Sequence, residues 1–200
     1  FPHAAERGER LVYRGYVASG GGLPEAVPNG EVLVSIGGGA FGETLARTAL
    51  AARPLSRLAE APWRLLLGHN LPGEVFQELR AAATGGVTVE RARPDFTALL
   101  GGCRLSISQA GYNTAVDLLQ AGVPAVLVPF AGGGETEQSQ RAEAFAAAGL
   151  AAVVPEAALS PESLARAVDA AAPPAPHGIS LDGAAETARL LRRLRDAGSP

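Results

Sequence analysis

Residues 32–52 read VLVSIGGGAFGETLARTALAA, and this stretch already indicates the class of fold. Val32–Ile36 is a short apolar run rich in β-branched residues, it stops in Gly37–Gly39, and a helical pattern follows from about Gly42 to Ala52. An apolar run of this length, bounded by glycine and followed at once by a helix, is typical of a βα unit. The stretch therefore predicts a strand, a glycine turn and a helix.

The same alternation recurs five more times downstream. The expected strands, each with the helix that follows it, are Trp63–Leu67 with Glu74–Ala82, Val87–Val89 with Phe96–Leu100, Arg104–Ser108 with Thr114–Ala121, Ala125–Val128 with Gln138–Ala148, and Ala151–Val154 with Pro161–Ala171. Consecutive βα units predict a Rossmann-like, doubly wound α/β fold, in which a mostly parallel six-stranded sheet carries helices on both faces.

The pattern changes at both ends of the chain. Residues 1–30 show little periodicity, and glycine and proline gather in their second half, as in a linker. After Ala172 a proline-rich run interrupts the alternation, and a last, arginine-rich helix is expected at about Gly183–Arg195, either solvated or docked on a neighbouring domain. We therefore expect an interdomain strand and linker over residues 1–30, a folded domain over 31–172, and a linker with a terminal helix over 173–200.

The composition excludes several classes of protein. A chain of 200 residues with 47% hydrophobic residues can bury roughly 70% of its surface, so it needs neither disulfides nor a structural metal. The net charge is −3 and the arginines are dispersed, which argues against nucleic-acid binding. No apolar run approaches the roughly 18 residues of a membrane span, and no signal peptide is recognised. These features favour a cytoplasmic protein, and the lack of an initial methionine suggests part of a larger one.

Few isolated residues stand out. Cys103, the single cysteine, is expected to be a small buried hydrophobe, and Trp63 and Phe145 are expected in the core. His69 follows the second expected strand and faces either the site or solvent.

The loops after the strands are the candidate site, because ligands of open parallel sheets bind outside the carboxyl ends of the strands. The loop Gly37–Gly42 lets main-chain amides approach a ligand and leads into a helix N-terminus, which favours anions. It has neither the G-x-G-x-x-G pattern of dinucleotide-binding proteins nor the Lys-Ser/Thr of a P-loop, so neither ligand is specifically indicated. A structural tight turn would explain its glycines equally well.

A second candidate loop lies between the expected strand ending at Ser108 and the next helix. Gly111, Asn113 and Thr114 offer amide and hydroxyl donors to a phosphate, unless they only cap the helix. Asp117, one turn further on, is placed to accept hydrogen bonds from sugar hydroxyls.

A third candidate loop, Pro129–Gln138, is polar and glycine-rich. Its Glu137 and Gln138 carry carboxylate and amide groups suited to sugar hydroxyls. A solvated helix start would explain Glu137 as well, because acidic residues favour the first turn.

Residues 108–129, SQAGYNTAVDLLQAGVPAVLVP, followed by Glu137–Gln138, resemble the donor-binding signature of GT-B glycosyltransferases. The nearest likeness is to the MurG-like transferases, which add N-acetylglucosamine to a lipid-linked acceptor, and a more distant one is to the UDP-glucuronosyl and plant UDP-glycosyltransferases. The likeness covers roughly residues 31–172, the C-terminal half of a GT-B fold. Residues 13–17 resemble the strand and linker that join the two halves.

The resemblance implies a role for each matching residue. It implies phosphate contacts from Gly38, Gly39, Gln109, Gly111, Asn113 and Thr114, a ribose contact from Asp117, a base contact from the main chain of Arg93, and donor-sugar contacts from Glu137 and Gln138. Two positions depart from the pattern. Gln109 stands where many relatives have His or Arg, which costs on the order of 1 kcal/mol of charge-assisted bonding, and Gly39 stands where MurG-like enzymes have serine.

The function that the resemblance implies is glycosyl transfer from a nucleotide-sugar donor, expected to be a UDP-sugar, with no metal or other cofactor. The acceptor site and the catalytic base would belong to an N-terminal domain outside this chain, so the fragment alone is expected to bind donor weakly and to transfer nothing. A sugar-nucleotide 2-epimerase of the same architecture and a non-catalytic nucleotide-sugar-binding module remain as alternatives. Peripheral membrane association of the full-length protein also stays open.

Overall fold

The computed structural model describes residues 12–18, 27–37, 42–134 and 136–197. They separate into two compact units, one within residues 23–176 and one that combines residues of the first 22 positions with those from 177 onward. The larger unit contains strands β1 (Val32–Ile36), β2 (Trp63–Leu67), β3 (Val87–Arg91), β4 (Leu105–Ser108), β5 (Ala125–Leu127) and β6 (Ala152–Val153). Its helices are α2 (Gly42–Ala52), α3 (Gly73–Ala82), α4 (Phe96–Gly102), α5 (Tyr112–Ala121), α6 (Glu137–Ala147) and α7 (Pro161–Ala170).

The six strands form one sheet in the order β3-β2-β1-β4-β5-β6, and every neighbouring pair is parallel. Val34 in the middle of β1 lies opposite Leu65 of β2 and Ile107 of β4. The strand order reverses between β1 and β4, where a doubly wound sheet opens a crevice at the carboxyl ends of its strands. The expected Rossmann-like α/β fold is confirmed.

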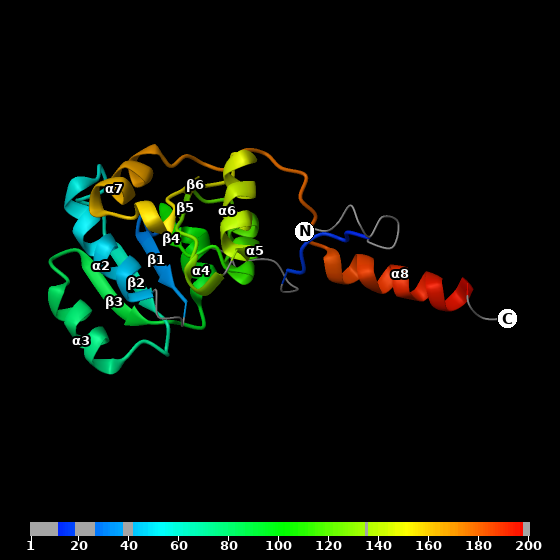
Figure 1. The fold of residues 1–200 in the computed structure, drawn as a ribbon, viewed down its shortest axis with the longest axis horizontal. Coiled ribbons are helices and arrows are strands. Elements are labelled where there is room, and N and C mark those ends of the chain that lie inside the picture. Colours follow the sequence, from blue (N-terminus) through cyan, green and yellow to red (C-terminus); the bar gives the residue numbers. More distant parts are fainter. Residues whose placement is uncertain (1–11, 19–26, 38–41, 135, 198–200) are drawn as a thin grey trace. The chain divides into compact units, whose positions relative to one another are not determined.

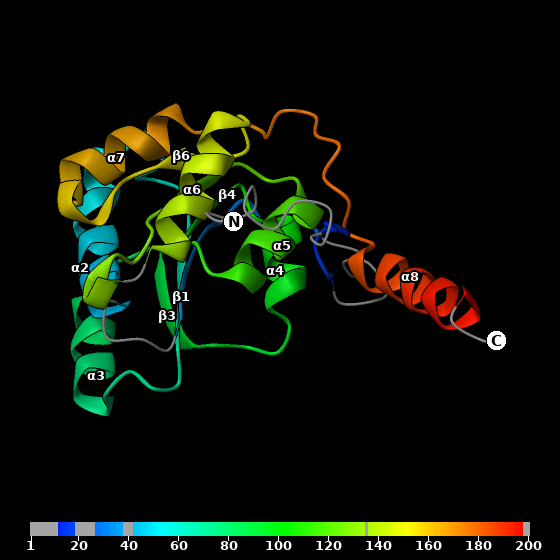
Figure 2. The same cartoon turned by 45° about the vertical axis from the view of Figure 1, so that its right-hand side comes forward.

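Helices cover both faces of the sheet. Figure 1 shows α2, α3 and α7 on one side of the strands and α4, α5 and α6 on the other, and the turned view in Figure 2 shows the same two layers. Val32, Val34 and Ile36 alternate along β1 and enter a core cluster that also holds buried residues of α2, α3 and α7. Trp63 is 1% exposed and Phe145 3%, which confirms both as core residues.

The observed elements agree with the expected ones to within two residues at nearly every boundary. Helix α5 begins at Tyr112, two residues before the expected Thr114, because Gly111 takes the N-cap position. Strand β3 continues two residues past Val89, to Arg91, since its main chain remains paired with Leu67 of β2. Three short 3-10 turns were not expected: η2 (Arg53–Leu55), η3 (Gly132–Gly134) and η4 (Glu156–Ala158).

The second unit joins the described residues 12–18 to helix α8 (Gly183–Ala197), which confirms the expected terminal helix. Val17 forms an antiparallel bridge with Asp182, and the Tyr16 N–H donates to Ser180 O at 2.8 Å. Gly15 has a φ of +85°, and a Cβ there would lie 2.5 Å from Ser180 O, so only glycine fits this approach. The linker glycines Gly20–Gly22 lie outside the described residues. Within the described ranges, no helix is long and apolar enough to cross a membrane.

Candidate functional site

The loop between β4 and α5 ends in an uncapped helix N-terminus. Gly111 is the N-cap residue in an extended conformation, with φ −61° and ψ 155°, and no side chain bonds to the first-turn amides as a cap. Asn113 and Thr114 lie inside the first turn, so neither caps the helix. A helix start of this kind presents main-chain N–H groups that need acceptors, and an anion satisfies them. A Cβ on Gly111 would meet nothing closer than 3.9 Å, so packing within the protein does not require glycine there.

Gln109 joins the loops that follow β1 and β4. Its Oε1 accepts a hydrogen bond from the Gly37 N–H at 3.2 Å. Because a main-chain N–H can only donate, this bond turns the amide oxygen toward Gly37 and leaves the Nε2 group as the donating end. Among the described residues no acceptor bonds that nitrogen, so Gln109 offers N–H donors at the crevice. The predicted phosphate residues Gly38 and Gly39 lie outside the described residues.

Asp117 lies one helical turn beyond the start of α5. Its carboxyl is partly buried, and this burial raises the pKa of Asp117 above the ordinary aspartate value. No group in the described ranges donates a hydrogen bond to this carboxylate. A partly desolvated carboxylate without a protein partner gains from a ligand that supplies hydroxyl donors.

The start of α6 carries the two residues expected to contact the donor sugar. Gln138 Oε1 accepts from the Phe130 N–H at 3.2 Å, which orients the Gln138 amide as Gly37 orients Gln109. Glu137 is exposed and forms an ion pair with Arg141, one turn further along the helix. The Ala131 N–H donates to the Glu156 carboxylate at 2.6 Å and ties this loop to η4.

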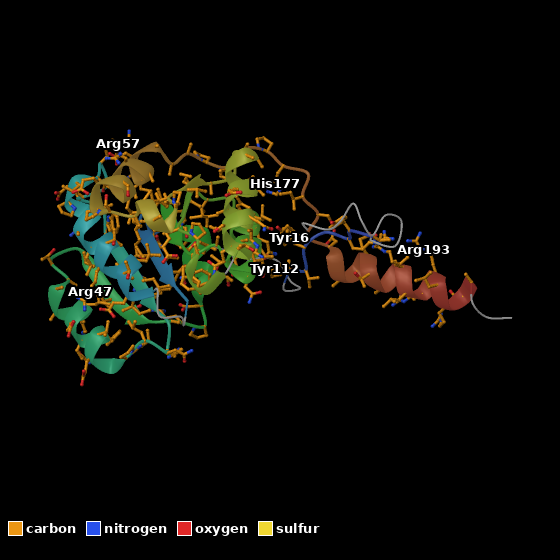
Figure 3. All side chains as sticks on the ribbon, in the orientation of Figure 1. Tyr16, Arg47, Arg57, Tyr112, His177 and Arg193 are labelled. Atoms are coloured by element: carbon orange, nitrogen blue, oxygen red, sulfur yellow. The ribbon has the colours of Figure 1, made fainter. Side chains whose placement is uncertain are left out.

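Arg141 was not anticipated from the sequence. Its Nη1 donates to Ala110 O at 2.7 Å, its Nη2 bonds Glu137, and its guanidinium carbon lies 5.8 Å from the centre of the Tyr112 ring. Tyr112, labelled in Figure 3, comes from the start of α5. Only 9% of the Arg141 side chain is exposed, so the guanidinium links α6 to the β4–α5 loop from a largely buried position. The spacing of four residues from Glu137 was the available signal, since such pairs meet on a helix.

Arg93 lies on the loop after β3, and its guanidinium is engaged by the protein. It bonds Asp95 at 2.7 Å and Glu90 at 3.2 Å, which raises the pKa of Arg93, and its charge lowers the pKa of Asp95. The groups of Arg93 that remain for a ligand are those of its main chain.

The structure therefore brings Gln109, Gly111, Asn113, Thr114, Asp117, Glu137 and Gln138 onto adjoining loops and helix starts of one sheet edge. Arg93 lies at the same edge of the sheet because it follows β3, and no contact joins it to the other predicted residues among those described. His69 is exposed after β2. Within the described residues no group of three or more His, Cys, Asp or Glu side chains could hold a metal ion.

Comparisons with known proteins agree with this architecture. One relative, the UDP-N-acetylglucosamine–N-acetylmuramyl-(pentapeptide) pyrophosphoryl-undecaprenol N-acetylglucosamine transferase of Rhodospirillum centenum, is 33% identical over 181 residues. That match covers 86% of this chain and 47% of the relative. The chain spans half or less of the length of such curated relatives.

Two solved structures resemble the chain. The crystal structure of Acinetobacter baumannii MurG matches with a TM-score of 0.54 and 25% identity over 69% of this chain and 40% of that one. CalG4, the calicheamicin glycosyltransferase, matches with a TM-score of 0.57 over 100% of this chain and 46% of that one, and its 21% identity shows the fold alone. The model of the glycosyltransferase family 28 C-terminal domain matches residues 33–189. The chain thus belongs to the family of glycosyltransferase family 28 C-terminal domains, and the resemblance to MurG-like transferases is confirmed.

Proposed function

We propose that this chain is the half of a glycosyltransferase that binds a nucleotide-sugar donor, with a UDP-sugar as its ligand. The observation that carries the proposal is the start of α5, where uncapped amides precede, by one helical turn, a partly buried carboxylate without a partner among the described residues. Amides attract a diphosphate, and the Asp117 carboxylate accepts from ribose hydroxyls. Both groups belong to one ligand, a nucleoside diphosphate.

The chemistry assigned to these residues is stabilisation of the departing diphosphate. As the glycosidic bond breaks, negative charge develops on the diphosphate, and donors already aimed at it lower the energy of the transition state. The first-turn amides of α5, the Thr114 hydroxyl and the Nε2 group of Gln109 would supply these donors. The contact from Gln109 replaces the charged one of many relatives, because its oxygen is already held by Gly37.

The donor sugar would lie against the start of α6. Gln138, with its oxygen bonded to the Phe130 N–H, would donate from its Nε2 to a sugar oxygen, whereas the Glu137 carboxylate would accept from a hydroxyl. We also propose that Arg93 recognises the base through its main chain, since its guanidinium is bonded to Asp95 and Glu90. Gly38 and Gly39 would complete the phosphate contacts.

The acceptor and the catalytic base are assigned to an N-terminal domain of a longer protein, because the chain matches less than the full length of its relatives. The name of the Rhodospirillum centenum relative specifies a UDP-N-acetylglucosamine donor, which supports a UDP-sugar here. Domain limits of 1–30, 31–172 and 173–200 are retained as part of this proposal.

The test is calorimetric titration of the 200-residue chain with UDP, dTDP, GDP, UDP-N-acetylglucosamine and NAD. One nucleoside diphosphate is expected to bind, and Asp117→Ala is expected to weaken it by about 1–3 kcal/mol, the cost of losing hydrogen bonds to a charged group. Glu60→Ala is the matched control, because Glu60 is an exposed carboxylate in the turn before β2, at the opposite edge of the sheet. Binding of NAD alone, or unchanged affinity in Asp117→Ala, would remove the donor-site assignment.

A further inference from the structure

A carboxylate beside a diphosphate needs an explanation, and Arg141 supplies one. Glu137 opens α6, and the guanidinium of Arg141 bonds both this carboxylate and the Ala110 carbonyl, which directly precedes the N-cap Gly111 of α5. The Glu137 carboxylate is therefore held one guanidinium away from the loop proposed to bind the diphosphate. Two negative groups at that separation repel each other unless a cation lies between them.

We infer that Arg141 is a positioning residue that offsets the charge of Glu137 and so allows this carboxylate to stand beside the donor diphosphate. The inference rests on the proposed function. Three contacts support it: the bond to Glu137, the bond of 2.7 Å to Ala110 O, and the position over the Tyr112 ring. Because the side chain is 9% exposed, its charge is screened less by solvent than that of a surface arginine.

The arrangement also couples two parts of the site. The same guanidinium holds the loop that ends at Ala110 and the first turn of α6, which come from segments 31 residues apart. Moving Glu137 therefore moves the cation next to the phosphate loop, so the sugar and diphosphate subsites are linked through one side chain.

The test is a double-variant experiment with Arg141→Met, Glu137→Gln and the combination of both. Each chain is titrated with UDP, or with dTDP or GDP if the unmodified chain binds that nucleotide instead. Arg141→Met leaves the Glu137 charge without an offset and is expected to weaken the diphosphate by about tenfold. The combined variant is expected to recover most of this loss, because the repelling charge is gone.

A purely structural role for Arg141 predicts a different result, namely the same loss in the single and the combined variant, and this outcome would overturn the inference. Unchanged affinity in Arg141→Met would also overturn it. The loss is expected to shrink between about 0.02 and 0.5 M salt, since salt screens repulsion between charges. Arg141→Lys, which keeps the charge, should lose less affinity than Arg141→Met.

Glu137→Gln alone guards against failure of the arginine variants to fold, because Glu137 is 71% exposed. It is expected to bind UDP about threefold more tightly, since Arg141 then faces the diphosphate with its charge no longer offset. Equal or weaker binding of UDP by Glu137→Gln would contradict the inference. If the unmodified chain binds none of the three nucleotides, the proposed function fails instead, so the two failures are distinguishable.

Discussion

At the scale of single residues, the main chain sets the polarity of the site. The Gly37 N–H takes the oxygen of Gln109, and the Phe130 N–H takes the oxygen of Gln138. Both glutamines are left to donate, which suits a diphosphate and the oxygens of a sugar. Asp117 is the complementary case, a carboxylate that can only accept when ionised and whose burial raises its pKa.

Asp117→Asn is expected to trade affinity for stability. Because burial penalises the ionised carboxyl in the folded state, removing the charge should raise the thermal midpoint at pH 7 by about 2 °C, the shift produced by somewhat less than 1 kcal/mol. The same change should weaken UDP binding by about tenfold, since the ribose hydroxyls lose a charged acceptor. Thermal melts and titrations, with Glu60→Gln as the control, measure both effects.

The pH dependence of this gain follows from the direction of the pKa shift. The pKa of Asp117 is higher in the folded than in the unfolded chain, so the folded state takes up the proton first as pH falls. The advantage of the asparagine variant should therefore be full above the raised pKa, shrink as pH falls through it, and vanish below the unfolded value of about 3.9. A gain of the same size at pH 3.5 and pH 7.5 would refute this origin.

At the scale of elements, a row of charges ties together the β3 side of the sheet. Arg64 on β2 bonds Glu31, which precedes β1, at 2.7 Å, and Glu90 on β3 at 2.9 Å. Glu90 in turn bonds Arg93, on the loop proposed to recognise the base. The bond to Glu31 raises the pKa of Arg64, so it stays charged throughout the range in which the protein is folded. The order of the strands therefore also orders the loop.

Arg64→Met should destabilise the larger unit by about 2 kcal/mol. The side chains of Arg64 and Glu31 are 18% and 14% exposed, so the substitution leaves two carboxylates short of a partner in a partly desolvated place. Urea unfolding measures the change. The matched control is Arg47→Met on α2, which also removes an arginine bonded to two glutamates, Glu43 and Glu78, but at an exposed position. A similar loss in both variants would show that burial does not decide the cost.

At the scale of the whole molecule, the single cysteine reports on the larger unit. Cys103 joins α4 to β4 and is 7% exposed, which confirms it as a buried residue. Burial raises the pKa of the Cys103 thiol to about 12, so its reactive thiolate is scarce near neutral pH. Chemical labelling of this thiol therefore requires the unit to open.

Labelling of Cys103 at pH 8 is expected to slow when the donor site is filled. A ligand that binds only the folded state lowers the population of the open state by the factor 1 + [L]/Kd, which is about a hundredfold at a UDP concentration of 100 Kd. The measurement is the rate of reaction with a thiol reagent with and without UDP, and uridine at the same concentration is the control. A rate that saturating UDP leaves unchanged would mean that α4 opens locally, independently of the site.

Most of the fold was predictable from the sequence because its signals are local. Apolar runs such as Val32–Ile36 and Trp63–Leu67, each followed by a helical pattern, were placed at their observed limits. The start of α5 was placed two residues late, because Tyr112 and Asn113 resemble loop residues until Gly111 is known to be the N-cap. The candidate site residues were found by resemblance, and their roles remain predictions.

The sequence by itself determined the succession of strands and helices, since hydrophobic periodicity and glycine turns act over a few residues, and this succession implied a parallel sheet. Only the tertiary structure decided which polar groups meet. Gln109 finds Gly37 across 72 residues, and Arg141 finds Ala110 across 31. Such pairs depend on how the strands are ordered in the sheet, because long side chains bond whatever the fold brings within reach. Arg141 was therefore invisible as a site residue until β4, α5 and α6 had been placed in space.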